Sequence, residues 1–207
     1  MEDVREHFQK KASSFDHLYD EDHPLQRFLR PGLNARREFA LDVVREHVSP
    51  RVLDVGCGSG RVGEEILAAG ASEYVGIDFS QPMLELAGQR LAHFGERARL
   101  VQGNFLEQEF DRLFDVVIVL GVFDYTPEPH EFVLRARRAC SGSVVATFPR
   151  WNWLKGPVRK VRYQVVNDCP IFNYTERELR FLFGAAGFSR CDIVKRGRTG
   201  YYVRADV

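Results

Sequence analysis

The sequence is poor in cysteine, and its four cysteines do not form a recognisable site. Cys57, Cys140, Cys169 and Cys191 include no CxxC pair, and no histidine lies at zinc-ligand spacing from any of them. We therefore expect four reduced thiols, no bound metal ion and a cytoplasmic location.

The sequence also lacks long apolar runs and a net charge. No stretch approaches the ~18 apolar residues of a membrane span, and the N-terminal MEDVREHFQK is charged where a signal peptide would be apolar. Basic and acidic side chains each number 29, so the formal net charge is zero. Because nucleic-acid binders depend on a positive field, we expect a small-molecule partner unless a local patch supplies that charge.

Apolar residues make up 44% of the chain, which is enough for a sizeable core. Short apolar runs suited to buried parallel strands alternate with helical segments and lie at 51–56, 73–78, 98–103, 114–121 and 143–149. Two further runs, 190–196 and 200–206, are joined by a short link that demands a hairpin. We predict an α/β fold, a Rossmann-like, doubly wound, mostly parallel seven-stranded sheet with one antiparallel C-terminal hairpin strand.

A single domain is expected over residues 1–207, with two segments that break the alternation. Residues 1–35 are expected to form a mainly helical N-terminal cover, with a turn near Pro31 and Gly32. Residues 150–174 form a long insertion between a strand and a helix.

Three helix boundaries have recognisable capping residues. Ser80 is predicted to cap the start of one helix, and Gly70 to follow the end of another. Thr175 with Glu178 three residues later predicts a capping box.

The stretch DVGCGSGRVGEE (54–65) places a glycine-rich turn between a strand and a helix. Such a turn lets a ligand lie against bare amides at the helix N-terminus. Gly58 begins a GxGxxG pattern, and Asp78 stands about 20 residues on, as in dinucleotide-binding proteins. Asp54, ahead of the glycines, would repel a pyrophosphate and favours a ligand that carries positive charge. A tight turn without any ligand is the third interpretation.

The pattern VLDVGCGSG, followed by GID at the end of the next strand, resembles the class I S-adenosylmethionine-dependent methyltransferases. The resemblance extends from about residue 34 onward and includes the AGF at 186–188 and the terminal hairpin. In layout the chain is similar to the ubiquinone-biosynthesis and magnesium-protoporphyrin O-methyltransferases. The resemblance implies S-adenosyl-L-methionine as the cofactor.

The resemblance also implies which residues bind this cofactor. Asp78 would accept hydrogen bonds from both ribose hydroxyls, and Arg36, with Arg37 as the neighbouring candidate, would bind the carboxylate. Asp54 would organise the glycine loop through backbone amides or water, and Asn104 would bind the adenine amino group. Phe79, Met83 and Phe105 would contact the adenine. The full expected set is Arg36, Asp54, Gly56, Gly58, Gly60, Asp78, Phe79, Met83, Asn104, Phe105, Leu120 and Gly121.

The segment LGVFDYTPEP (120–129) departs from the ubiquinone-type relatives, which carry an acid-rich stretch ending in Glu-His here. Without that histidine a metal-assisted reaction is not expected. A hydroxyl acceptor gains from a base, whereas a carboxylate needs none. Asp124, Tyr125 and His130 are the candidates to face the acceptor, because they follow the carboxyl end of the central strand.

The insertion at 150–174 is rich in basic and aromatic residues. We expect it to be a lid over a partly apolar acceptor, with Arg159, Arg162 and Tyr174 contacting an anionic group on it. Tyr19, in FDHLYDED, would close over the site from the N-terminal cover. The alternative is a surface helix whose arginines are solvated.

The sequence therefore predicts methyl transfer from S-adenosylmethionine to an oxygen of a small or lipid-like molecule. Three other functions stay open: methylation of RNA or protein, cofactor-dependent regulation without turnover, and NAD-dependent oxidoreduction.

Overall fold

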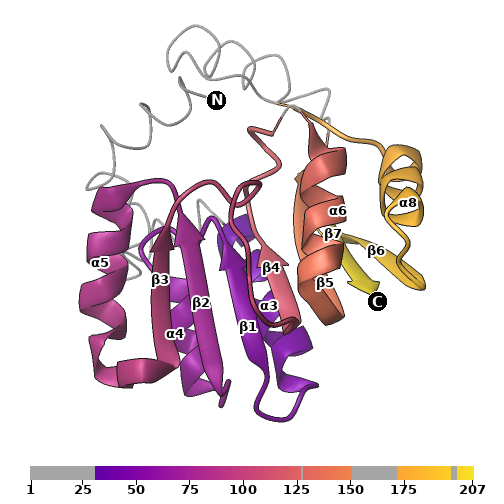
Figure 1. Cartoon of the computed structure of the whole chain (residues 1–207). Coiled ribbons are helices and arrows are strands. Elements are labelled where there is room, and N and C mark those ends of the chain that lie inside the picture. Colours follow the sequence, from indigo (N-terminus) through magenta and orange to yellow (C-terminus); the bar gives the residue numbers. More distant parts are fainter. Residues whose placement is uncertain (1–30, 127, 151–171, 197–199) are drawn as a thin grey trace, which may run out of the picture.

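The computed structural model describes residues 31–126, 128–150, 172–196 and 200–207 (Figure 1). The first thirty residues of the predicted N-terminal cover and residues 151–171 of the insertion lie outside the described residues.

Seven strands form one sheet in the order β3-β2-β1-β4-β5-β7-β6. Strands β1 to β5 pair in parallel, whereas β7 runs antiparallel between β5 and β6. The predicted α/β sheet with an antiparallel hairpin strand is confirmed. The bounds are β1 Arg51–Val55, β2 Glu73–Asp78, β3 Ala98–Gln102, β4 Phe114–Val119, β5 Cys140–Pro149, β6 Arg190–Arg196 and β7 Gly200–Asp206.

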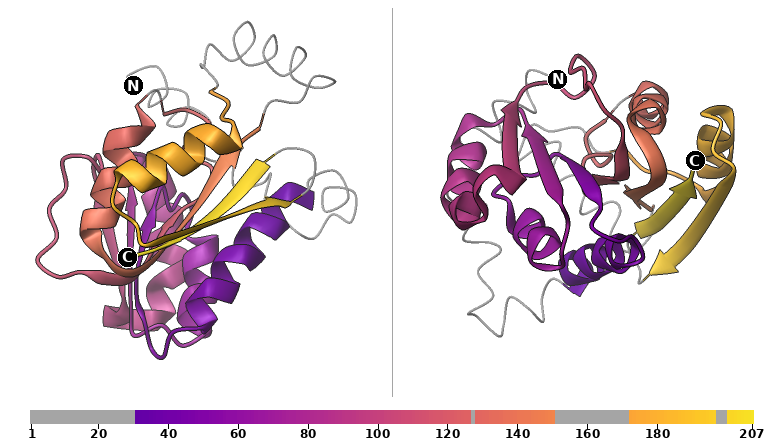
Figure 2. Two further views of the ribbon diagram at one scale, coloured as in Figure 1. Left: turned by 90° about the vertical axis from the view of Figure 1, so that its right-hand side faces the viewer. Right: turned by 60° about the horizontal axis from the view of Figure 1, so that its bottom comes forward.

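Helices cover both faces of the sheet (Figure 2). One face packs against α6 and α8, and the other against α3, α4 and α5. The bounds are α3 Pro31–Arg45, α4 Arg61–Ala68, α5 Gln81–Leu91, the 3-10 helix η1 Ala92–Arg97, α6 Pro129–Ala139 and α8 Glu176–Ala185. The predicted turn at Pro31 and Gly32 is wrong, because α3 begins there.

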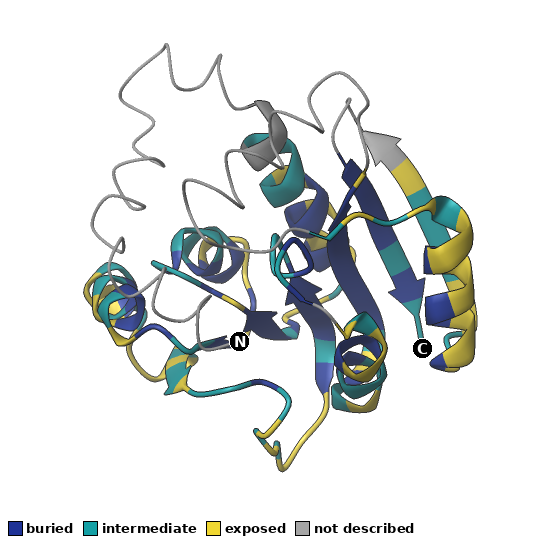
Figure 3. Cartoon of the chain, turned by 90° about the horizontal axis from the view of Figure 1, so that it is seen from above, coloured by how far each residue is buried: buried dark blue, intermediate teal, exposed yellow. Residues whose placement is uncertain are grey.

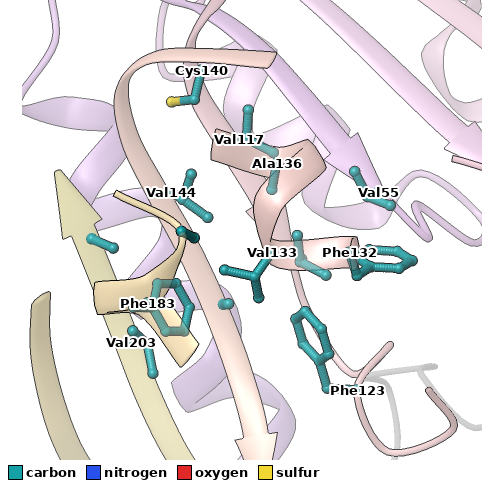
Figure 4. Packing of buried hydrophobic residues seen from close by; sticks show 14 of the residues in the cluster. Val55, Val117, Phe123, Phe132, Val133, Ala136, Cys140, Val144, Phe183 and Val203 are labelled. Carbon is teal, nitrogen blue, oxygen red and sulfur yellow. The ribbon is translucent and has the colours of Figure 1, made fainter. Parts of the chain in front are cut away.

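The strands bury both faces because side chains alternate along them. In β4, Val117 and Val119 join the core beneath α6 and α8, whereas Val116 and Ile118 join the core beneath α3 to α5. Seen from above, the sheet is buried while the outward sides of the helices are exposed (Figure 3). Aromatic rings such as Phe132 and Phe183 fill the first core (Figure 4).

The predicted caps have mixed outcomes. Thr175 and Glu178 form the expected capping box, with each side chain bonded to the other's backbone amide. Gly70 follows α4 with a φ of 102°. Ser80 is the N-cap residue of α5, as predicted, but its hydroxyl makes no cap hydrogen bond. Instead Asp78 Oδ1 accepts from the Ser80 amide at 2.9 Å, and this bond orders the entry to the helix.

Candidate functional site

The predicted site residues gather where the parallel strands end. The loops after β1, β2 and β4 meet at the carboxyl edge of the sheet, because these strands are neighbours and run in one direction. This edge is where open α/β sheets bind ligands.

The glycine loop after β1 is held by backbone hydrogen bonds, and at Gly56 it leaves no room for a side chain. The amides of Gly56 and Cys57 both donate to the Ile77 carbonyl, at 2.8 and 3.2 Å. Gly56 has a φ of 75°, and a Cβ added there would lie 2.6 Å from Val122 Cγ2. Glycine is therefore required at this position, and it lets the loop after β1 touch the loop after β4.

Asp78 ties the glycine loop to the end of β2. Its Oδ2 accepts from the Gly58 amide at 2.9 Å, and its Oδ1 accepts from the Ser80 amide at 2.9 Å. Burial raises the pKa of this carboxyl above its usual range, although the backbone hydrogen bonds lower it in part. Each carboxylate oxygen can accept a further hydrogen bond, so Asp78 can bind a pair of hydroxyl donors from a ligand.

Asp54 lies on the other side of the loop and has an unexpected partner. The Tyr74 hydroxyl donates to Asp54 Oδ2 at 2.9 Å, and both side chains are buried. Burial raises the pKa of Asp54 to about 7, while the Tyr74 hydrogen bond opposes the rise and the Asp78 charge adds to it. The hydrogen-bond partner of Asp54 in the structure is thus a tyrosine of the next strand, and its bonding to loop amides or water stays a prediction.

Sequence reasoning missed two residues that organise this loop. Tyr74 fits only because position 63 is glycine, since a Cβ there would lie 2.4 Å from Tyr74 Cζ. Arg90, on α5, donates from its guanidinium to the Ser59 carbonyl and pairs with Glu64 at 3.8 Å. A sequence signal existed for Tyr74: a glycine at position 63, in the helix after β1, leaves space for a large side chain on the neighbouring strand.

Arg36 and Asp124 meet at the end of β4. Arg36, on α3, places its Nη1 3.8 Å from Asp124 Oδ2. Gly121 has a φ of 75°, and a Cβ there would lie 3.2 Å from the same Nη1, so the guanidinium lies over the loop after β4. The Gly121 amide donates to Thr147 Oγ1 at 3.0 Å, which fixes the start of that loop.

The described end of the insertion returns to the same loop. The Phe172 amide donates to the Asp124 carbonyl at 3.1 Å, and the Tyr174 hydroxyl donates to the Thr126 carbonyl at 3.1 Å. Burial, with a smaller contribution from the Asp124 charge, raises the pKa of Tyr174 to about 12. Tyr174 is therefore a neutral hydrogen-bond donor near Asp124.

Two of the residues predicted to face the methyl acceptor are more exposed to solvent than Asp124. Tyr125 is half-buried next to Asp124, and its amide donates to the Val122 carbonyl at 3.0 Å. His130 is exposed in the first turn of α6. Tyr19, Arg159 and Arg162 lie outside the described residues.

The predicted adenine-side residues differ in burial. Met83 is buried on the first turn of α5, whereas Phe79 and Leu120 are half-buried at the ends of β2 and β4. Asn104 Oδ1 accepts from the Leu106 amide at 3.1 Å, and Asn104 Nδ2 donates to Glu107 at 2.8 Å.

Phe105 is 3% exposed and packs against Phe132, with the ring centroids 4.9 Å apart. Phe105 is thus part of the core beside the site, and its contact with adenine stays a prediction.

Within the described ranges, no group of three or more histidine, cysteine, aspartate or glutamate side chains could hold a metal ion. The helices in the same ranges are all too short or too polar to cross a bilayer. Cys57, Cys140 and Cys191 are free thiols, and Cys169 is outside the described residues.

Comparison with known proteins shows which family and which relatives this chain is similar to. Residues 53–142 match the family described as a methyltransferase domain. The chain is 29% identical over 103 residues to a ubiquinone biosynthesis O-methyltransferase of Rickettsia felis, covering 48% of this chain and 42% of that protein. It is 35% identical over 109 residues to a tRNA U34 carboxymethyltransferase of Aeromonas hydrophila, covering 49% and 33%. The chain thus spans less than half the length of either relative.

Solved structures share the whole fold. The magnesium protoporphyrin IX methyltransferase of Synechocystis PCC 6803 superposes with a TM-score of 0.79 at 18% identity, over 98% of this chain and 97% of that one. The 1,6-didemethyltoxoflavin-N1-methyltransferase of Burkholderia thailandensis gives a TM-score of 0.72 at 18% identity, over 99% and 87%. These comparisons relate residues 53–142 to a methyltransferase domain, and the chain as a whole shares the fold of solved methyltransferases.

Proposed function

We propose that the chain transfers the methyl group of S-adenosylmethionine to an oxygen of a small or lipid-like acceptor that carries an anionic group. The observation that carries this proposal is the composition of the carboxyl edge: a tight glycine loop, the Asp78 carboxylate that bonds this loop, and Arg36 beside Asp124. The ubiquinone-biosynthesis relatives, which are named as O-methyltransferases, support oxygen as the attacked atom.

The cofactor would be held from both ends. Asp78 would accept from the ribose hydroxyls, since its two oxygens already point at the glycine loop and at α5. Arg36 would bind the carboxylate of the methionine moiety, because its guanidinium lies over Gly121. Gly56, Gly58 and Gly60 would let the ligand approach the backbone between these two ends.

The adenine would lie near the ends of β2 and β3. Phe79 and Met83 would supply the apolar surface for it, while Leu120 and Gly121 would line the cofactor from beneath. Asn104 Oδ1 keeps one lone pair for the adenine amino group beyond its bond to Leu106.

S-adenosylmethionine supplies a methyl group that its sulfonium already makes electrophilic, so the protein has to align the acceptor and exclude water. Asp124 would accept the proton of an acceptor hydroxyl, because it is buried at the end of β4. Tyr125 would orient the acceptor. Tyr174, at the end of the insertion, would form one side of the acceptor site. His130, exposed at the start of α6, would lie at the rim.

The insertion is proposed to close over the acceptor through Arg159 and Arg162. Reversing both charges with Arg159→Glu and Arg162→Glu should raise the acceptor KM at least about tenfold, the cost of a charge-assisted contact, while leaving S-adenosylmethionine affinity unchanged. An unchanged KM would instead indicate a solvated surface helix.

Methylation of tRNA is a second candidate, because several relatives at about one-third identity are named tRNA U34 carboxymethyltransferases. The formal net charge of zero opposes it, since nucleic-acid affinity depends on positive charge.

Two measurements test the proposal in sequence. Isothermal titration should show S-adenosylmethionine binding, and incubation with phenols, carboxylates, anionic lipids and tRNA should release S-adenosylhomocysteine with one of the small molecules. Release with tRNA alone would favour the second candidate. Binding without release for any acceptor would favour a regulator. Uptake of a nicotinamide nucleotide in place of S-adenosylmethionine would overturn the proposal.

A further inference from the structure

Arg36 and Asp124 form an ion pair in the part of the site where the cofactor's carboxylate is proposed to bind. The two side chains come from α3 and from the loop after β4, and their closest atoms are 3.8 Å apart. The Asp124 side chain is 7% exposed and that of Arg36 is 23% exposed. A buried carboxylate is stable only with a partner, and Arg36 supplies a positive charge for it.

The same guanidinium therefore has two possible carboxylate partners, one from the protein and one from the ligand. Arg36 Nη1 also lies over Gly121, where a Cβ would come within 3.2 Å of it, and the Arg36 side chain is 23% exposed, so part of it is accessible to a ligand. A carboxylate arriving there would compete with Asp124 for the same charge.

We propose that Asp124 occupies Arg36 in the cofactor-free protein and that the carboxylate of S-adenosylmethionine displaces it. Cofactor loading then turns Asp124 toward the acceptor, so the acceptor binds productively only after the cofactor. This inference rests on the proposed function and adds an order of binding to it.

The test compares two ligands, S-adenosylhomocysteine and 5′-methylthioadenosine, which keeps the adenosine and the sulfur but lacks the amino acid moiety. Asp124→Asn removes the competing charge and should tighten S-adenosylhomocysteine binding about two- to tenfold in isothermal titration, the range of a partly exposed ion pair. Affinity for 5′-methylthioadenosine should not change. Arg36→Met should weaken S-adenosylhomocysteine about tenfold or more and remove the effect of Asp124→Asn in the double variant.

Matched controls come from the same helix. Asp42→Asn removes an exposed acid of α3 that pairs with Arg45, and Arg37→Met removes the neighbouring arginine that pairs with Glu65. Asp42→Asn should leave both affinities unchanged, and Arg37→Met should not reproduce the loss seen with Arg36→Met. Asp124→Ser provides a second uncharged variant if thermal unfolding shows that Asp124→Asn is not folded.

The possible failures are distinguishable. Weaker S-adenosylhomocysteine binding in Asp124→Asn would mean that Asp124 binds the ligand's ammonium group and would overturn the inference. Unchanged binding in Asp124→Asn and Asp124→Ser would also overturn it, because no competition would exist. If the wild-type protein binds neither ligand, the proposed function itself fails.

Discussion

The two edges of the sheet use carboxylates in opposite ways. At the amino edge, Glu73 accepts from Arg51 Nε at 2.7 Å, and this hydrogen bond is the largest cause that lowers the pKa of Glu73. At the carboxyl edge, burial raises the pKa of both Asp54 and Asp78. Folding thus favours the charge on Glu73 and disfavours the charges on Asp54 and Asp78.

This difference separates the residues that stabilise the fold from those that bind the ligand. Arg51 bonds Glu73 and also donates its backbone amide to Asp115 at 2.8 Å, which joins β1, β2 and β4 at their starts. At the ends of the same strands, Asp54 accepts from the Tyr74 hydroxyl and Asp78 from backbone amides, rather than from a basic side chain. A positively charged ligand would stabilise the ionised form of these two carboxyls. Such an arrangement is expected of a site for S-adenosylmethionine.

The largest expected effect is at the carboxyl end of β2. Asp78→Ala should weaken S-adenosylmethionine binding about 100-fold, because two hydrogen bonds to a charged group are lost together. Isothermal titration of this variant is to be compared with Glu73→Ala, at the opposite end of the same strand, which should change the affinity less than about twofold. Equal losses in the two variants would remove the distinction between the edges.

The sequence was sufficient for the parts of the site that depend on the backbone. The glycine loop and Asp78 were predictable because a tight turn needs glycine and because strand order puts the end of β2 beside that turn. The alternating apolar runs predicted the sheet for the same reason, since each strand must bury both of its faces.

Side-chain partners that are distant in sequence were not predictable. Asp54 and Tyr74 meet only because the β1–β2 register and the glycine at position 63 bring them together. Phe105 packs against Phe132 of α6, and nothing in the motif around Phe105 predicts this neighbour. Position in a motif predicts that a residue is near the site, whereas its contacts depend on elements far along the chain.

A smaller effect on stability is expected at the amino edge. Glu73→Ala should lower the free energy of unfolding by about 1 kcal/mol, the value of a partly exposed ion pair, as measured by urea denaturation. Because the pKa of Glu73 is lowered in the folded protein, its contribution is present above the ordinary glutamate pKa and is lost as pH falls through the folded value. The difference between wild type and variant should therefore shrink in acid.

The opposite pH dependence is expected at Asp54. The raised pKa of Asp54, about 7, means that its contribution to stability is greatest below its unfolded value and is lost as pH rises through 7. The free energy of unfolding of Asp54→Asn, relative to wild type, should thus be higher above neutrality than in acid. For Glu73→Ala the same difference should be lowest above neutrality. Thermal unfolding of both variants between pH 5 and pH 8.5, in steps of about 0.5, distinguishes the two trends.

Tyr74→Phe tests the same carboxyl through ligand binding. Its hydroxyl lowers the pKa of Asp54, so removing it should leave Asp54 more protonated at pH 7 and weaken S-adenosylmethionine about threefold. The loss should disappear near pH 8.5, where the carboxylate is again ionised. S-adenosylhomocysteine, which lacks the sulfonium charge, should lose less affinity than S-adenosylmethionine at every pH. A loss that is equal for both ligands and independent of pH would mean that Tyr74 only supports the glycine loop sterically, through its contact with Gly63.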